Sequence, residues 1–210
     1  MKIAVIAKPW HGADAAYRDY LLAQATKTQS MAGAICGTRV TDLVGLLRQA
    51  DPRPATGRSR ILSLSCVGRS ALAIGCRHTY ELFVLKAAGF APVTGIDLLS
   101  PAPSVLPMDM HHMTFPDHAF DVIFACHSLE HAYDVDVALS EWARVTKPGG
   151  VWAIEVPIGF PTTRVDRHDF GSRAGLQARC APYAPILLHG SETRGAHGVA
   201  RVIVQTPKGV

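Results

Sequence analysis

Two positions, a glycine and an acid, have the residue types and spacing that could hold a nucleoside. Gly75 follows a short apolar stretch, and Asp97 ends a second stretch, Val93–Asp97, 22 residues further along. A glycine at a strand-to-helix turn lets the backbone approach a ligand closely, and a carboxylate about 20 residues later, at the next strand tip, can accept hydrogen bonds from a ribose diol. We predict a nucleoside loop at Gly75 and a ribose contact at Asp97. An ordinary tight turn and a turn aspartate are the structural alternatives.

A third candidate strand tip adds contacts. Asp109, Met110 and His111 follow the apolar stretch Val105–Met108. Asp109 could accept a hydrogen bond from an exocyclic amine, with Met110 packed on an adenine face, or it could be a turn acid. Adjacent side chains rarely face one site, so we expect no metal at His111 and His112. The predicted binding set is Gly75, Cys76, Arg77, Asp97, Leu98, Asp109, Met110, His111 and His127.

One histidine is the candidate for acid–base chemistry. His127 follows Phe120–Cys126, a continuous apolar run of strand length. An imidazole titrates near neutral pH and can act as a general base. We predict that His127 lines the pocket as the catalytic base; a structural imidazole held by backbone groups is the alternative.

Strand and helix patterns alternate along the chain and would position these residues. Helices are expected over 13–25 and 41–49. The helix-breaking segment 51–57 separates an N-terminal appendage, residues 1–57, from a main body, residues 58–210, and the appendage is a possible lid. Short apolar pieces at 1–7 and 61–64 predict a strand and an edge strand. In the body we expect strands at 71–75, 93–97, 105–108, 120–126 and 150–156, helices at 80–88, 129–145 and 171–180, and an antiparallel hairpin at 184–188 and 199–205. This alternation predicts an α/β fold, a mostly parallel sheet with helices on both faces, which binds ligands beyond the strands' carboxyl ends.

Composition and charge narrow the function classes. The 210 residues are 48% hydrophobic and 18% charged with a net charge of +4, which favours one folded domain and no membrane span. The start of the chain does not resemble a signal peptide, and the five cysteines form no C-x-x-C pair, so we expect free thiols in the cytoplasm and no zinc. Between Asp97 and Ala143 there are eight acids and no Lys or Arg. If that stretch lines a cleft, the cleft would favour a cationic ligand.

Taken together, these motifs resemble those of the class I S-adenosylmethionine-dependent methyltransferases, in the group often called type 11. The resemblance covers about residues 71–157 and rests on Val93–Asp97, Met108–Met110, Phe115–Asp117 with Phe120–Ile123, Ser128–His131 and Arg144–Gly150. It implies a Rossmann-like sheet of seven strands whose last strand is antiparallel. It also implies S-adenosylmethionine as cofactor, with Gly75 at its methionine part, Asp97 on the ribose, Asp109 and Met110 at the adenine, and His127 under the reactive methyl.

The glycine loop departs from that family pattern, because Ala73, Arg77 and Thr79 stand where the family usually has an acid and further glycines. We expect a methyltransferase that acts on a small molecule, as a monomer or homodimer. A non-catalytic binding or scaffold protein of the same fold is the alternative. A nicotinamide-dependent dehydrogenase would need G-x-G-x-x-G after the strand, which is absent. The scattered arginines of the C-terminal third carry no interleaved aromatics, so no nucleic-acid partner is expected.

Overall fold

Seven strands form one sheet in the order β3-β2-β1-β4-β5-β7-β6. The computed structural model describes residues 15–30, 37–49, 66–76, 79–99, 102–195 and 198–208. Strand β7 pairs antiparallel with both β5 and β6, while the pairs from β3 through β5 are parallel. The strands are β1 (Ala71–Ile74), β2 (Val93–Asp97), β3 (Val105–Pro107), β4 (Phe120–Cys126), β5 (Thr146–Pro157), β6 (Ile186–Thr193) and β7 (Val199–Gln205). The predicted fold class is confirmed, including the antiparallel last strand.

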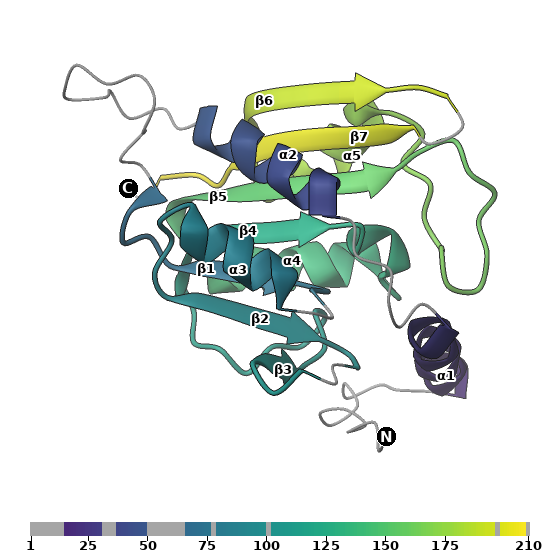
Figure 1. Ribbon diagram of the computed structural model, residues 1–210. Coiled ribbons are helices and arrows are strands. Elements are labelled where there is room, and N and C mark those ends of the chain that lie inside the picture. Colours follow the sequence, from purple (N-terminus) through teal and green to yellow (C-terminus); the bar gives the residue numbers. More distant parts are fainter. Residues whose placement is uncertain are drawn as a thin grey trace.

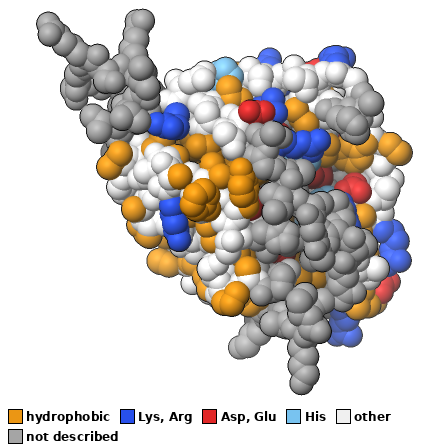
Figure 2. Space-filling model, in the orientation of Figure 1, with side chains coloured by type: hydrophobic (Ala, Val, Ile, Leu, Met, Phe, Trp, Pro, Cys, Tyr) orange, Lys and Arg blue, Asp and Glu red, His pale blue; other side chains and the backbone are white. Residues whose placement is uncertain are grey.

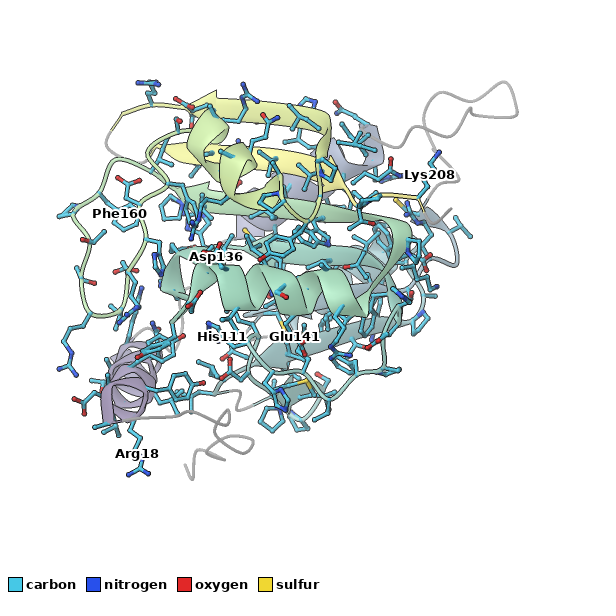
Figure 3. All side chains as sticks on the ribbon, turned by 180° about the vertical axis from the view of Figure 1, so that it is seen from behind. Arg18, His111, Asp136, Glu141, Phe160 and Lys208 are labelled. Carbon is cyan, nitrogen blue, oxygen red and sulfur yellow. The ribbon has the colours of Figure 1, made fainter. Side chains whose placement is uncertain are left out.

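Helices cover both faces of this sheet. Figure 1 shows α2 (Gly37–Gln49) and α3 (Tyr80–Ala87) on one face, with α4 (Val135–Val145) and α5 (Arg173–Cys180) behind it. Helix α1 (Ala15–Ser30) stands apart from these layers, beyond the carboxyl ends of the parallel strands. Seen from behind, α4 crosses the middle of the sheet, and the loop that carries Phe160 descends toward α1 (Figure 3).

Each face of the sheet has its own hydrophobic core. Behind the sheet, Trp142 of α4 packs edge-on against Trp152 of β5 with ring centroids 5.9 Å apart. On the other face, Leu43 of α2 and Leu85 of α3 are fully buried over Phe124 of β4. Burial of a side chain of this size is worth about 1.5–3 kcal/mol. The central strands are therefore apolar on both faces, which explains the continuous runs in the sequence.

The segment 129–145 was predicted as one helix, and that prediction is wrong. A 3-10 turn, Leu129–His131, is followed by a break, and α4 begins only at Val135. Asp134 causes the restart, because its carboxylate accepts hydrogen bonds from the backbone N–H groups of Asp136 and Val137 at 2.9 and 3.1 Å. The break leaves the 3-10 turn directly beyond the tip of β4.

The other elements agree with expectation apart from their ends. Strand β5 begins four residues early, and β6 runs from Ile186 to Thr193 rather than over 184–188. The apolar pieces at 1–7 and 61–64 and the breaker at 51–57, with the expected domain boundary, lie outside the described residues. No helix in the described part of the chain is both long and apolar enough to cross a membrane.

Candidate functional site

A cleft opens at the carboxyl ends of the strands, between the sheet and α1. It encloses about 520 Å³ of empty space, part of which is open to solvent. Its lining comes from the tips of β1, β2 and β4, the segment after β3, and α1. The lining residues are Tyr20, Gln24, Ile74, Gly75, Ile96, Asp97, Leu98, Leu99, Met108, Met110, His127, Ser128 and His131.

Gly75 lines the cleft at the turn after β1, and glycine is required there for two reasons. Its φ of +71° lies in the left-handed region that side chains disfavour, and an added Cβ would stand 2.4 Å from the Cβ of Ser128. The glycine thus lets the tips of β1 and β4 meet. Cys76 turns away from the lining: its thiol donates to the Ile96 carbonyl at 3.7 Å, and burial raises its pKa. Arg77 lies outside the described residues.

The second strand tip presents the predicted acid to the cleft. Asp97 and Leu98 both line it, and Asp97 Oδ1 accepts a hydrogen bond from the backbone N–H of Leu99 at 2.9 Å. Met110 lines the same region, with Ile96 and Met108 beside it. Among the described lining residues, Asp97 is the carboxylate beside an apolar wall, whereas the sequence predicted a second carboxylate, Asp109, in the cleft.

Asp109 and His111 lie behind that wall and are absent from the lining. Asp109 Oδ1 accepts from the backbone N–H and from Nδ1 of His111, at 2.9 and 2.6 Å, and its Oδ2 accepts from the Tyr17 hydroxyl of α1. The other ring nitrogen of His111, Nε2, accepts from the backbone N–H of Asp134 at 3.2 Å. Both residues are buried. Their bonds join α1, the β3 tip and the start of α4, so in the described structure the carboxylate of Asp109 serves internal contacts.

His127 reaches the cleft from a strained backbone and is held by charged side chains. Its φ of +54° is unusual for a residue with a side chain, and its backbone N–H donates to the Glu155 carbonyl at 2.9 Å. Its ring Nε2 lies 2.9 Å from Oε1 of Glu155, and a guanidinium nitrogen of Arg39 lies 2.9 and 3.2 Å from Nε2 and Nδ1. Glu155 is fully buried and also accepts from Arg201 Nε. The guanidinium of Arg39 can only donate and the Glu155 carboxylate accepts, and both lie 2.9 Å from Nε2, so the two side chains together hold the imidazole in place at the cleft.

A buried carboxyl lies beneath the cleft floor. Glu130 is 1% exposed, and its Oε2 finds no hydrogen-bond partner among the described residues. Its Oε1 lies 3.7 Å from Nδ1 of His127 and 3.7 Å from Nε2 of His131. Burial raises the pKa of Glu130 to about 8. Neither Glu130 nor Glu155 was predicted from the sequence as a site residue.

Helix α1 closes one side of the cleft. Tyr20 and Gln24 line it, and the Tyr20 hydroxyl is buried without a partner in the described structure. The loop after β5 is bonded to this helix: Gln24 donates a hydrogen bond to the Val165 carbonyl at 2.9 Å, and Lys27 forms an ion pair with Asp166 at 2.5 Å. These α1 residues belong to the segment predicted as a possible lid, but their individual contacts were not predicted from the sequence.

Most acids of the acid-rich stretch, residues 97–143, lie away from the cleft lining. Several of its acids form ion pairs away from the lining: Asp117 and Glu141 with Arg144, Asp121 with Lys147, and Asp136 with Arg179. Figure 3 shows Asp136 and Glu141 on α4, behind the sheet. Of the eight acids, Asp97 alone is among the described lining residues, and four of the others are paired with nearby Lys or Arg side chains.

Comparisons with known proteins match this domain to one family. Residues 72–154 match the family model described as a methyltransferase domain. A demethylmenaquinone methyltransferase of Thermobifida fusca (strain YX) is 32% identical over 129 residues, which are 60% of this chain and 50% of that protein. The chain thus spans about half the length of that curated relative.

Solved structures share the fold at low identity. A 1,6-didemethyltoxoflavin-N1-methyltransferase of Burkholderia thailandensis, solved with 1,6-didemethyltoxoflavin and S-adenosylhomocysteine bound, superimposes with a TM-score of 0.68 at 12% identity, over 98% of this chain and 95% of its own. The [4+2]-cyclase SpnF gives a TM-score of 0.60 at 18% identity, over 81% of each chain. These likenesses show the fold, and the family match confirms the resemblance seen in the sequence.

Proposed function

We propose that this chain, which carries a class I S-adenosylmethionine-dependent methyltransferase domain over residues 72–154, transfers a methyl group to a small molecule. The observation that carries the proposal is the cleft at the strand tips, where Gly75, Asp97 and Met110 meet. The bound cofactor supplies an electrophilic methyl group on a sulfonium.

The residues of the cleft fit that cofactor. Asp97 can accept hydrogen bonds from the ribose hydroxyls, and Ile96, Leu98 and Met110 offer an apolar surface to the adenine. Two buried hydroxyls beside the cleft, those of Tyr20 and Ser128, lack partners in the described structure and can bond polar atoms of a ligand. We retain Cys76 and Arg77 as neighbours of this site, and Asp109 with His111 as its support from behind.

His127 is the proposed base on the floor of the cleft. Methyl transfer from a sulfonium is an in-line displacement, so the protein mainly holds donor and acceptor in the reacting geometry. Glu155 and Arg39 together hold the imidazole, and a ring nitrogen can take the proton of an O–H or N–H acceptor. Arg39 lies against the ring in the described structure, and the acceptor would take its place.

Two observations favour a small acceptor. The demethylmenaquinone methyltransferase relative and the 1,6-didemethyltoxoflavin methyltransferase are both named for small-molecule substrates. On the face shown in Figure 2, the described Lys and Arg side chains are scattered rather than gathered in one patch, and the absence of a nucleic-acid partner stays a prediction. A cytoplasmic location and a monomeric or homodimeric state stay predictions.

The second candidate is a non-catalytic protein of this fold that serves as a binding or scaffold subunit for another molecule. The altered glycine loop favours it, since Ala73 replaces the acid that the family usually carries there. The [4+2]-cyclase neighbour also shows that this fold is found in a protein named for a different reaction.

Calorimetric titration with S-adenosylmethionine and S-adenosylhomocysteine separates the two candidates. We expect saturable binding by the wild type and affinity at least about 5-fold weaker in Asp97→Ala, because a hydrogen-bonded carboxylate is worth about 1–3 kcal/mol. Asp117→Ala is the matched control, since Asp117 pairs with Arg144 and lies outside the lining. No heat at millimolar cofactor would favour the non-catalytic scaffold, and an unchanged affinity in Asp97→Ala would remove the ribose assignment.

A further inference from the structure

Arg39, on the first turn of α2, is a cation whose hydrogen-bond donors are poorly used in the described structure. Its guanidinium forms no ion pair with a described residue, and its polar contacts there run to the ring of His127, 3.2 Å from Nδ1 and 2.9 Å from Nε2. A guanidinium carries several N–H donors in a fixed fork. The start of α2 lies at the carboxyl ends of β4 and β5 (Figure 1), so this cation stands at the edge of the sheet where the cleft opens.

The contact with His127 does not satisfy the guanidinium. One nitrogen of Arg39 lies almost equally far from both ring nitrogens, and the outward directions of these two nitrogens diverge, so it is aligned with neither. Nε2 also lies 2.9 Å from Oε1 of Glu155. One ring nitrogen cannot both donate to a carboxylate and accept from a guanidinium. Among the described residues, this leaves a charged donor beside the proposed base without an oxygen to bind.

The carboxyls near the imidazole do not balance this cation. Glu155 is buried and already forms an ion pair with Arg201. Glu130 lies beneath the floor of the cleft, and desolvation raises its pKa to about 8, so at neutral pH most of it carries a proton. Asp42 is exposed and lies 3.9 Å from Arg201. Two guanidiniums, those of Arg39 and Arg201, therefore face one buried carboxylate around the imidazole.

We propose that Arg39 binds the acceptor oxygen as an oxyanion, so that the acceptor of this protein is a phenol or an enol rather than an amine. The inference rests on the proposed function and names its substrate class. The acceptor oxygen would enter between the guanidinium and the ring of His127, where it would bond to Arg39 and face the base at the same time. Ser128 adds a second donor, because its hydroxyl lies beside the cleft, buried without a partner in the described structure.

The protons and electrons of the transfer balance in this arrangement. His127 takes the proton of the acceptor O–H, and Arg39 stabilises the negative charge that appears on the oxygen. An electron pair of that oxygen forms the bond to the methyl carbon as the carbon–sulfur bond breaks, and the pair of the broken bond stays on sulfur. The products are a methyl ether, S-adenosylhomocysteine and one proton, which His127 releases to solvent. An amine gains positive charge as it attacks, so a guanidinium at this position would oppose its methylation.

Absorption spectroscopy with 4-nitrophenol tests the proposal on the wild-type protein and without methyl transfer. The probe is added to protein saturated with S-adenosylhomocysteine, and its visible phenolate band is followed against pH. We expect the bound probe to ionise at a lower pH than the free probe. The phenolate should bind at least about 10-fold more tightly than the neutral ether 4-nitroanisole, because a charge-assisted hydrogen bond to the guanidinium favours the anion.

Substitutions then assign the effect to one side chain. Arg39→Gln should weaken phenolate binding about 10-fold and return the ionisation of the bound probe toward that of the free probe. Arg39→Lys should retain part of the shift, because it keeps the charge but loses the fork. Arg179→Gln is the matched control, since it removes the same charge from an exposed pair with Asp136 outside the lining, and its phenolate affinity should equal that of the wild type.

Four results would overturn the inference: no binding of 4-nitrophenol at millimolar concentration, an ionisation that is not shifted to lower pH, a shift that persists in full in Arg39→Gln, or equal losses in Arg39→Gln and Arg179→Gln. Calorimetric binding of S-adenosylhomocysteine by the wild type reports separately on the proposed function. Saturable cofactor binding with an unshifted probe refutes the acceptor class alone, whereas the loss of cofactor binding itself refutes the proposed function.

Discussion

Replacement of Glu130 by glutamine should change the pH dependence of stability in a direction fixed by its environment. Burial raises the pKa of this carboxyl from 4.5 to about 8 in the folded protein. Between these values the folded state holds a proton that the unfolded chain has lost, so stability contributed by Glu130 is full below about pH 4.5 and falls as the pH rises through about 8. One pKa unit corresponds to about 1.4 kcal/mol. The wild type should therefore lose on the order of 4 kcal/mol relative to Glu130→Gln between about pH 5 and pH 8.

Urea unfolding of the two proteins at a series of pH values measures this difference directly. Other titrating groups are common to both proteins and cancel, so the free energy of unfolding of Glu130→Gln minus that of the wild type should rise by about 1.4 kcal/mol per pH unit in this window. Glu141→Gln serves as the control, because Glu141 accepts hydrogen bonds from Arg144 and from the Met113 N–H. Its difference from wild type should not follow that slope. A flat difference for Glu130→Gln, or one that falls with pH, would refute the assignment of a raised pKa to this carboxyl.

Three further substitutions test the supports of the cleft by urea unfolding. Gly75→Ala should lower the free energy of unfolding by about 3 kcal/mol through backbone strain and the clash with Ser128. Gly159→Ala is the control and should lower it by only about 1 kcal/mol, because Gly159 has a φ of +74° but nothing within 4 Å of an added Cβ. Equal losses in the two variants would contradict the close contact at Gly75. Asp134→Ala should cost about 1 kcal/mol by removing the cap of α4, and no loss would show that α4 does not need it. Glu155→Gln should lower the free energy of unfolding by about 3 kcal/mol because it replaces the buried charged partner of Arg201 by a neutral one. The exposed carboxylate of Asp117, which pairs with Arg144, is the control, and Asp117→Asn should change stability little.

Much of the fold could be predicted because its central strands, β1 and β4, are almost entirely buried and therefore rich in apolar residues. The bounds of the strands 93–97, 120–126 and 199–205 were predicted to the residue. The helix expected over 129–145 shows the opposite case. Apolar residues such as Leu129, Tyr133 and Val137 keep a helical spacing across the break, and that periodicity outweighed the capping signal of Asp134.

The site was predictable where strand tips determine it. Gly75, Asp97, Leu98, Met110 and His127 all line the cleft, because the tips of parallel strands converge at one edge of the sheet. Asp109 and His111 were predicted in the cleft for the same reason, because they follow a strand tip. Hydrogen bonds between them and from the Tyr17 hydroxyl hold them behind the apolar lining instead. The sequence gives no sign of that contact, which joins residues 92 positions apart.

The residues that sequence reasoning missed depend on tertiary pairing. Tyr20 reaches the cleft only because α1 packs at the strand ends, and nothing local to the helix encodes that placement. Glu155 could have been found, since an acid inside the apolar run of β5 must have partners when buried. Those partners are His127 and Arg201.

The central claim is that the strand tips form one binding site for an adenosyl group. A crystal structure of the protein with S-adenosylhomocysteine tests it most directly. We predict ligand density in the cleft, with the ribose hydroxyls at the carboxylate of Asp97 and the adenine against Met110. Density at another surface, or a cleft that stays filled by side chains of the protein at saturating ligand, would contradict the claim.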